Sequence, residues 1–246
     1  MDDMLYVAMS GAKETLIAQA AATNNLANAS TTGFLADLNQ FRSMPVFGSG
    51  HPTRVYALSE RPLADFEHGG VQYSGRDLDV AVKGGGWIAV QAPDGGEAYS
   101  RRGDLRVDEN GLLMTGNNLP VMGNGGPIAV PPFEKIDIGV DGTISVRPLG
   151  STAEQLAVID RIKLVAPQFG QMEKGDDGLF RQRDGELAEA DPAQRLESGA
   201  LESSNVNVVN EMVDMIELSR RFELQVKMMK TAEESASAAA SIVRPV

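Results

Sequence analysis

The chain has 246 residues, 42% of them hydrophobic, and a formal net charge of −12 at neutral pH. Proteins that bind nucleic acid or an anionic membrane surface neutralise phosphates with Lys and Arg, so this acidic balance argues against both partners. The sequence has no cysteine, which excludes disulfides, thiolate metal sites and cysteine nucleophiles.

The first predicted element is an amphipathic helix from Met4 to Asn28. Its stripe follows a spacing of four and three residues and consists of Leu5, Met9, Ala12, Leu16, Gln19, Thr23 and Leu26. Acidic residues precede the helix and polar residues interrupt it, so we expect neither a signal peptide nor a membrane-inserted segment. The helix needs a partner to cover its stripe.

A glycine-rich region follows an extended connector that is predicted over 34–68. Turn-forming pairs such as Asn110-Gly111 and Asp141-Gly142 separate short apolar runs, which is typical of antiparallel strands. The predicted strands are Leu78–Val82, Trp87–Gln91, Leu105–Val107, Leu112–Thr115, Ile128–Val130, Ile136–Val140, Ile144–Val146, Ala157–Val165 and Leu179–Arg183. We therefore expect a β-rich domain over 69–185, followed by a second extended connector over 186–204.

The last predicted element is a second amphipathic helix, from Val206 to Val243, with Asn205 or Asn207 as its N-cap. Its stripe consists of Met212, Met215, Ser219, Phe222, Val226, Met229, Glu233, Ala236, Ala240 and Val243. Burying one large aliphatic side chain contributes about 1.5–3 kcal/mol, so pairing the two stripes outweighs capping and helix propensity.

The predicted fold class is α+β, with the N- and C-terminal helices paired as a coiled-coil-like domain and a central antiparallel β-rich domain. The expected segments of the chain are 1–33, 34–68, 69–185, 186–204 and 205–246.

No catalytic residue, cofactor or metal site is predicted. His51 and His68 lie in loop-like contexts without a cysteine or a spaced carboxylate partner. The three glycines at 84–86 precede a strand and not a helix, so a turn is favoured over a phosphate-binding loop.

Two long motifs at opposite ends of the chain resemble the bacterial flagellar rod and hook proteins. The segment Asn24 to Phe34 is similar to their N-terminal signature, and Leu201 to Glu223 is similar to their C-terminal signature. In the middle, the strand motif that contains Trp87 and the segment Ser43 to Val46 most resemble proximal rod members of the family. Distal rod members are the close alternative.

The resemblance implies a structural subunit without catalytic activity. Such a subunit would assemble helically with itself and other rod proteins to form the periplasmic drive shaft and export channel. It would reach the periplasm through the flagellar type III export apparatus, without a cleaved signal peptide. Carried over from the motifs, the expected assembly interface consists of Leu5, Met9, Leu16, Asn24, Asn25, Leu26, Asn28, Gly33, Phe34, Leu201, Asn205, Val206, Met212, Met215, Ile216, Phe222, Val226 and Met229.

Two other classes of function stay open. A cell-wall-active enzyme with a β core would need a pair of carboxylates in a cleft, for which Asp77 and Asp79 are the candidates. A coiled-coil adaptor would bind a partner helix through its Met-rich C-terminal helix. Deleting residues 206–246 would abolish self-assembly in a rod subunit, but only a hetero-complex in an adaptor.

Overall fold

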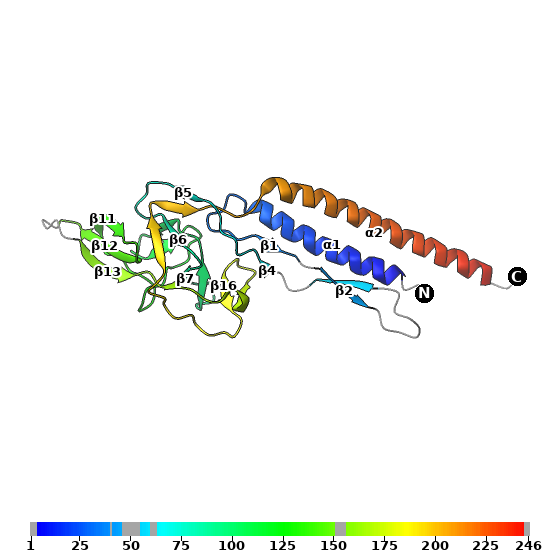
Figure 1. The fold of residues 1–246 in the computed structure, drawn as a ribbon, viewed down its shortest axis with the longest axis horizontal. Coiled ribbons are helices and arrows are strands. Elements are labelled where there is room, and N and C mark those ends of the chain that lie inside the picture. The colour runs from blue at the N-terminus through cyan, green and yellow to red at the C-terminus, as the bar shows by residue number, and fades with distance from the viewer. Residues whose placement is uncertain (1–3, 40, 46–54, 60–62, 151–155, 244–246) are drawn as a thin grey trace. The chain divides into compact units, whose positions relative to one another are not determined.

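A computed structural model describes residues 4–39, 41–45, 55–59, 63–150 and 156–243 (Figure 1). The helices in this part of the chain are α1 (Met4–Ala27) and α2 (Val208–Val243), with a 3-10 turn at Phe169–Gln171. The strands are β1 (Asp37–Leu38), β2 (Phe41–Pro45), β3 (Val55–Ser59), β4 (Leu63–Ala64), β5 (Val71–Tyr73), β6 (Val80–Lys83), β7 (Trp87–Gln91), β8 (Glu97–Ser100), β9 (Leu105–Val107), β10 (Leu113–Thr115), β11 (Phe133–Ile138), β12 (Thr143–Pro148), β13 (Ala157–Arg161), β14 (Leu164–Val165), β15 (Met172–Lys174), β16 (Phe180–Gln182), β17 (Arg195–Ser198) and β18 (Ala200–Glu202).

The chain folds as two units. The helical unit consists of Met1–Ala29, Asp37–Asp65 and Val206–Val246, and the β unit consists of Ser30–Ala36 and Phe66–Asn205. The division of the chain into five segments that the sequence suggested stays a prediction.

In the helical unit, α1 and α2 lie side by side and run antiparallel (Figure 1). Thr15 Oγ1 lies 3.1 Å from Gln225 Oε1, and nearer the end of α1 the Asn25 amide lies 3.0 Å from Glu211. Asn207 caps α2, because its Oδ1 accepts hydrogen bonds from two backbone amides of the first turn. Two strand pairs, β1 with β4 and β2 with β3, complete this unit.

The predicted fold class, α+β with the two helices paired as a coiled-coil-like domain, is wrong. The described chain is mostly β, with one helix near each end, and several residues of the predicted coiled-coil stripes, such as Met212 and Val226, are exposed. Most buried side chains of α1 are small, with Ala12, Ala18 and Ala22 among them, although Glu14 and Asn25 are buried as well, whereas the larger Met9 and Leu16 are exposed. The prediction failed because it assigned the packing face to the largest apolar residues, although small residues allow two helices to approach more closely.

Every strand pair of the β unit is antiparallel. The largest sheet has the order β14-β7-β8-β16-β15, and a second sheet has the order β11-β12-β13. Strand β7 is buried on both faces because its sequence is a continuous apolar run with Trp87 at its start. The Trp87 ring packs on Phe180, with 4.5 Å between the ring centroids.

The region predicted as a strand at Ile128–Val130 differs in the structure. It forms an isolated bridge between Ala129 and Leu112 instead of a continuous ladder. Prolines at both sides of this run, Pro127 and Pro131, lack the backbone N–H that a ladder requires.

The last two strands before α2 return to the β unit. Strand β17 pairs with β6, and β18 pairs with β5. The segment that leads into α2 is therefore held by strand pairs of the β unit.

Candidate assembly surface

Helix α1 has an inner face made mainly of small residues, together with Glu14 and Asn25, and an outer face with large apolar residues. Ala8, Ala12, Thr15, Ala18 and Ala22 are buried, at positions that recur every three or four residues. On the other side, the large apolar side chains of Tyr6, Met9, Leu16 and Ile17 are exposed, with Met9 at 53% and Leu16 at 49%. The helical unit therefore leaves the larger apolar face of α1 uncovered.

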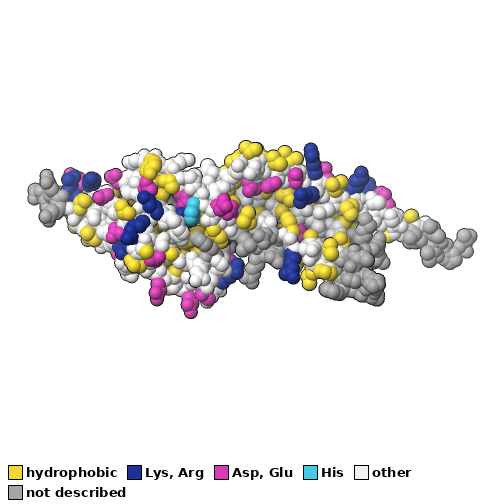
Figure 2. All heavy atoms as spheres, viewed as in Figure 1, with side chains coloured by type: hydrophobic (Ala, Val, Ile, Leu, Met, Phe, Trp, Pro, Cys, Tyr) yellow, Lys and Arg dark blue, Asp and Glu magenta, His cyan; other side chains and the backbone are white. Residues whose placement is uncertain are grey.

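Helix α2 also has a covered and an exposed face, but its half-buried face contains large apolar residues, namely Met215, Leu218, Phe222 and Met229. Hydrophobic side chains gather at the start of α2 (Figure 2), and Ile216 is 56% exposed. We call the exposed large apolar side chains of both helices the outer helix surface; its members are Tyr6, Met9, Leu16, Ile17, Val208, Val209, Met212, Val213, Ile216, Leu224, Val226 and Met228. Exposed apolar surface of this extent makes the outer helix surface a candidate interaction site.

The predicted interface residues fall into three groups. Met9, Leu16, Met212, Ile216 and Val226 belong to the outer helix surface. A second group is half-buried on the helices or just before α2 and consists of Leu5, Leu26, Val206, Met215, Phe222 and Met229. The third group holds this chain together and consists of Asn24, Asn25, Asn28, Gly33, Phe34, Leu201 and Asn205.

Asn25 illustrates the third group within the helical unit. Its side chain is only 3% exposed, and its amide pairs with both backbone groups of Asp37: Oδ1 accepts from the N–H at 2.7 Å and Nδ2 donates to the carbonyl at 3.0 Å. Nδ2 also donates to Glu211 in α2. Asn24 donates to the Asp37 carboxylate, and Asn28 donates back to Asn24. These asparagines fasten the end of α1 to β1 and to the start of α2.

Asn205 has the equivalent role in the β unit. Its Oδ1 accepts from the Ala36 N–H at 2.8 Å, its Nδ2 donates to the Glu67 carbonyl at 2.9 Å, and its own N–H donates to the Phe34 carbonyl. The Gly33 N–H donates to the backbone carbonyl of Glu202 at 2.8 Å. Leu201 is part of β18 and pairs with Gln72 of β5.

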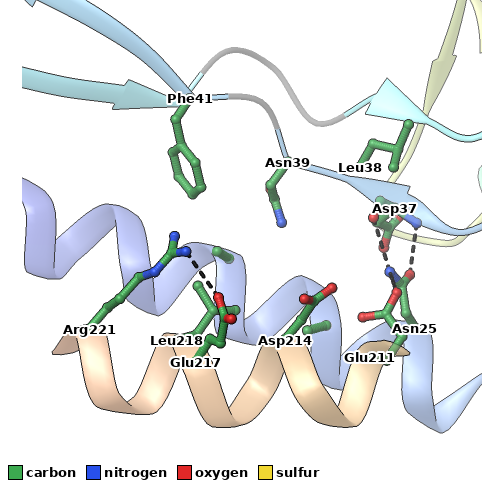
Figure 3. Close-up of a pocket in the computed structure, with 12 residues that line it drawn as sticks. Asn25, Asp37, Leu38, Asn39, Phe41, Glu211, Asp214, Glu217, Leu218 and Arg221 are labelled. Carbon is green, nitrogen blue, oxygen red and sulfur yellow. Dashed lines mark hydrogen bonds and ion pairs between the residues drawn. The ribbon is translucent and has the colours of Figure 1, made fainter. Parts of the chain in front are cut away.

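An acidic hollow of about 260 Å³ lies between α1, α2 and the segment that contains β1 (Figure 3). Asp37, Glu211, Asp214 and Glu217 line it, and Arg221 pairs with Glu217 at 3.1 Å. Burial raises the pKa of Glu211, and the nearby charges of Asp214 and Asp37 raise it further, against the hydrogen bond from Asn25. The hollow therefore holds a carboxylate whose ionisation is disfavoured.

The candidate carboxylates for an enzyme do not form an open pair. Asp79 is 1% exposed, and its carboxylate lies 3.4 Å from Arg76, whereas Asp77 is exposed. Within the described ranges, no cluster of three or more His, Asp or Glu side chains is arranged to hold a metal ion. His68 lies 3.8 Å from Glu202, and His51 is outside the described residues.

Neither described helix is long and apolar enough to cross a membrane.

The outer helix surface also contains residues that the sequence-based interface omitted, namely Tyr6, Ile17, Val208, Val209, Val213, Leu224 and Met228. Their signal in the sequence was the pairing of adjacent apolar positions, as at Leu16 and Ile17, which makes the apolar stripe wider than a single repeat.

Three family models match separate parts of the chain. Residues 5–34 match the description "Flagella basal body rod protein", residues 81–146 match "Flagellar hook protein FlgE/F/G D1 domain", and residues 197–242 match "Flagellar basal body rod FlgEFG protein C-terminal". The first and third of these matches contain most of α1 and α2.

Relatives match the chain over nearly its whole length. It is 44% identical to the flagellar basal-body rod protein FlgF of Escherichia coli (strain K12), covering 97% of each chain. It is 43% identical to FlgF of Salmonella typhimurium, covering 96% of each chain. The flagellar basal-body rod protein FlgG of Buchnera aphidicola from Schizaphis graminum is more distant, with 30% identity over 94% of this chain and 95% of the relative.

Proposed function

Because this chain belongs to the flagellar basal-body rod protein family, we propose that the outer helix surface is where it contacts neighbouring subunits. The chain is a structural subunit of the proximal rod and assembles with other flagellar rod proteins. Head-to-tail contacts that do not close into a ring generate helical tubes, which is the geometry that a rod requires. The proposal concerns which residues make those contacts.

The exposure of large apolar side chains on both terminal helices is the observation that carries this proposal. Leu16 and Ile216 are each about half exposed, although covering such a side chain contributes about 1.5–3 kcal/mol. Met215, Phe222 and Met229 of α2 are half-buried in the single chain. Leu16 and Ile216 keep about half of their surface exposed, so the full gain at these two side chains is not realised within one chain. Contact with the helices of neighbouring copies would realise it.

The finer parts of the role are also proposals. We expect helically arranged copies to enclose the export channel, with the chain placed in the periplasm by the flagellar type III apparatus without loss of a signal peptide. A purely mechanical role without catalysis is supported by the buried, paired state of Asp79 and by relatives that are named as rod proteins. The net charge of −12 is consistent with protein partners and not with nucleic acid.

Charged substitutions on the outer helix surface test the proposal. Leu16→Asp and Ile216→Asp place a carboxylate on a surface that is exposed in the single chain, so each variant should fold and be exported. Each should block rod assembly, because a charge would have to be buried against a neighbour. The measurements are swimming motility and the presence of rods in purified basal bodies.

Val158→Asp provides the matched control, because Val158 is an apolar residue of β13 that is 67% exposed. It should leave assembly intact. Normal motility of both helix variants, or loss of motility in the Val158 variant alone, would contradict the proposed surface.

A further inference from the structure

Three segments of the β unit lead to or from the helical unit, and we call them the junction segments. They are 30–36, 66–70 and 200–205, and the chain passes between the units at residues 29–30, 36–37, 65–66 and 205–206. They are far apart in the sequence, yet the first two both bond to Glu202, a residue of the third. This convergence is not explained by a surface for assembly.

Glu202 binds the junction segments through both its side chain and its backbone. Its backbone carbonyl accepts from the Gly33 N–H at 2.8 Å, and its Oε1 accepts from the Gly69 N–H at 3.3 Å. In the next position, the Ser203 N–H donates to the Gly70 carbonyl at 2.8 Å. The side chain of Glu202 is 2% exposed, so these bonds are shielded from water.

Arg101 neutralises Glu202 and fixes it to the sheet. Its Nε lies 2.8 Å and its Nη2 lies 2.7 Å from Glu202 Oε2, so both nitrogens pair with the same carboxylate oxygen. The remaining N–H groups donate to the carbonyls of Val82, Gly84 and Gly86. The guanidinium therefore donates four hydrogen bonds in addition to the close approach of Nη2 to Glu202, although the side chain is only 1% exposed.

The backbones of the junction segments approach Arg101 and one another so closely that a side chain larger than hydrogen would not fit at Gly33 or Gly69. A Cβ atom on Gly33 would lie 2.4 Å from the backbone carbonyl of Arg101, and one on Gly69 would lie 1.8 Å from the carbonyl oxygen of Ser203. Segment 30–36 is thus in close backbone contact with Arg101, and segment 66–70 is in close backbone contact with segment 200–205.

We propose that Arg101 and Glu202 form a buried lock that fastens all three junction segments to one point of the β unit. A force that displaces one segment is then resisted by the bonds of the other two. The lock is a property of the single chain and does not depend on the proposed assembly surface. Loosening the lock should release the segments together, because opening the junction is the least costly way to hydrate a buried charge that has lost its partner.

Hydrogen exchange of the purified full-length protein, followed by mass spectrometry, tests the lock. In Glu202→Gln, which keeps the shape of the side chain but removes its charge, the amides of Gly33, Gly69 and Ser203 should exchange about tenfold faster or more. Over the same labelling times, the core amides of β7 should stay protected. Arg101→Lys keeps the positive charge, but an ammonium has three N–H donors for the four oxygen acceptors that Arg101 contacts. Exchange should therefore also become faster in the same three segments.

Lys83→Gln is the matched control, since it removes an exposed ion pair between Lys83 and Glu197 on the adjoining strands β6 and β17. It should leave exchange in the junction segments unchanged. The lock is refuted if both Glu202→Gln and Arg101→Lys accelerate hydrogen exchange only in segment 200–205, or if both leave the exchange of the Gly33 amide unchanged. It is also refuted if both variants expose the β7 amides as much as the junction amides.

Discussion

At the scale of single residues, small side chains and amides decide where distant parts of the chain meet. Gly33 lies against the backbone of Arg101, and Asn25 pairs with both backbone groups of Asp37. Neither contact involves a large apolar surface. The motif Asn24 to Phe34, which contains both residues, therefore specifies contacts within the chain, in addition to any role that this motif has in assembly.

Replacing Gly33 with Ala should destabilise the β unit. Gly33 has φ of 65°, a left-handed conformation in which a side chain costs about 1–3 kcal/mol, and the new Cβ would also meet the Arg101 carbonyl at 2.4 Å. Chemical denaturation, followed by the fluorescence of Trp87, measures the loss. Gly170→Ala is the control, because no atom lies within 4 Å of a Cβ there; equal unfolding midpoints for the two variants would show that Gly33 is not constrained.

Replacing Glu211 with Gln should stabilise the helical unit at neutral pH. The pKa of Glu211 is raised above its ordinary value of 4.5 by burial and by Asp214 and Asp37, so the folded state binds its proton more tightly than the unfolded state. The ionised carboxylate therefore lowers stability above this pH range, and the penalty disappears as the pH falls below about 4.5. Gln can still accept the hydrogen bond from Asn25.

Thermal unfolding of wild type and Glu211→Gln across a series of pH values measures this effect. The variant should melt at a higher temperature at pH 7, and the difference should shrink as the pH is lowered towards 4. A variant that is less stable than wild type at pH 7 would show that the ionised carboxylate supports the fold.

At the scale of elements, each helix has one face for its own chain and another that its own chain leaves exposed. The buried face of α1 is built mainly from alanines, together with Glu14, Thr15 and Asn25. Large residues such as Leu16 lie on the other face. Small apolar residues inside and large ones outside on α1 are the reverse of what a self-sufficient amphipathic helix would show.

Ala12→Leu should destabilise the helical unit. Ala12 is buried in α1, and inserting a larger side chain into a packed site costs about 1–3 kcal/mol. Ala20→Leu is the control, because Ala20 is exposed on the same helix. Far-UV circular dichroism during heating should show earlier loss of helix in the Ala12 variant alone. Equal melting of the two variants would contradict the assigned inner face.

The sequence was a good guide to the elements and a poor one to their faces. It predicted both helices to within two residues at their starts, and the bounds of strands such as Trp87–Gln91, because periodicity and turn residues are local signals. It misassigned the packing face of α1, because nothing local distinguishes an apolar residue that packs within the chain from one left exposed. It also gave no sign that Arg101 and Glu202, distant in sequence, pair in the β unit.

At the scale of the whole molecule, two chain ends that lie far apart in sequence come together in one helical unit, while the β unit is continuous except for a short N-terminal segment. The polypeptide therefore enters and leaves the β unit through a few junction segments. A subunit of a rod needs both a surface for its neighbours and a firm connection to the remainder of the chain. The outer helix surface and the Arg101–Glu202 pair are the features that we assign to these two needs.

A density map of intact basal bodies, at a resolution that shows side chains, tests the central claim most directly. We expect α1 and α2 of each copy to pack against helices of neighbouring copies, with Leu16 and Ile216 buried in those contacts. Continuous contacts made by the β units, with Leu16 and Ile216 still facing solvent, would contradict the account.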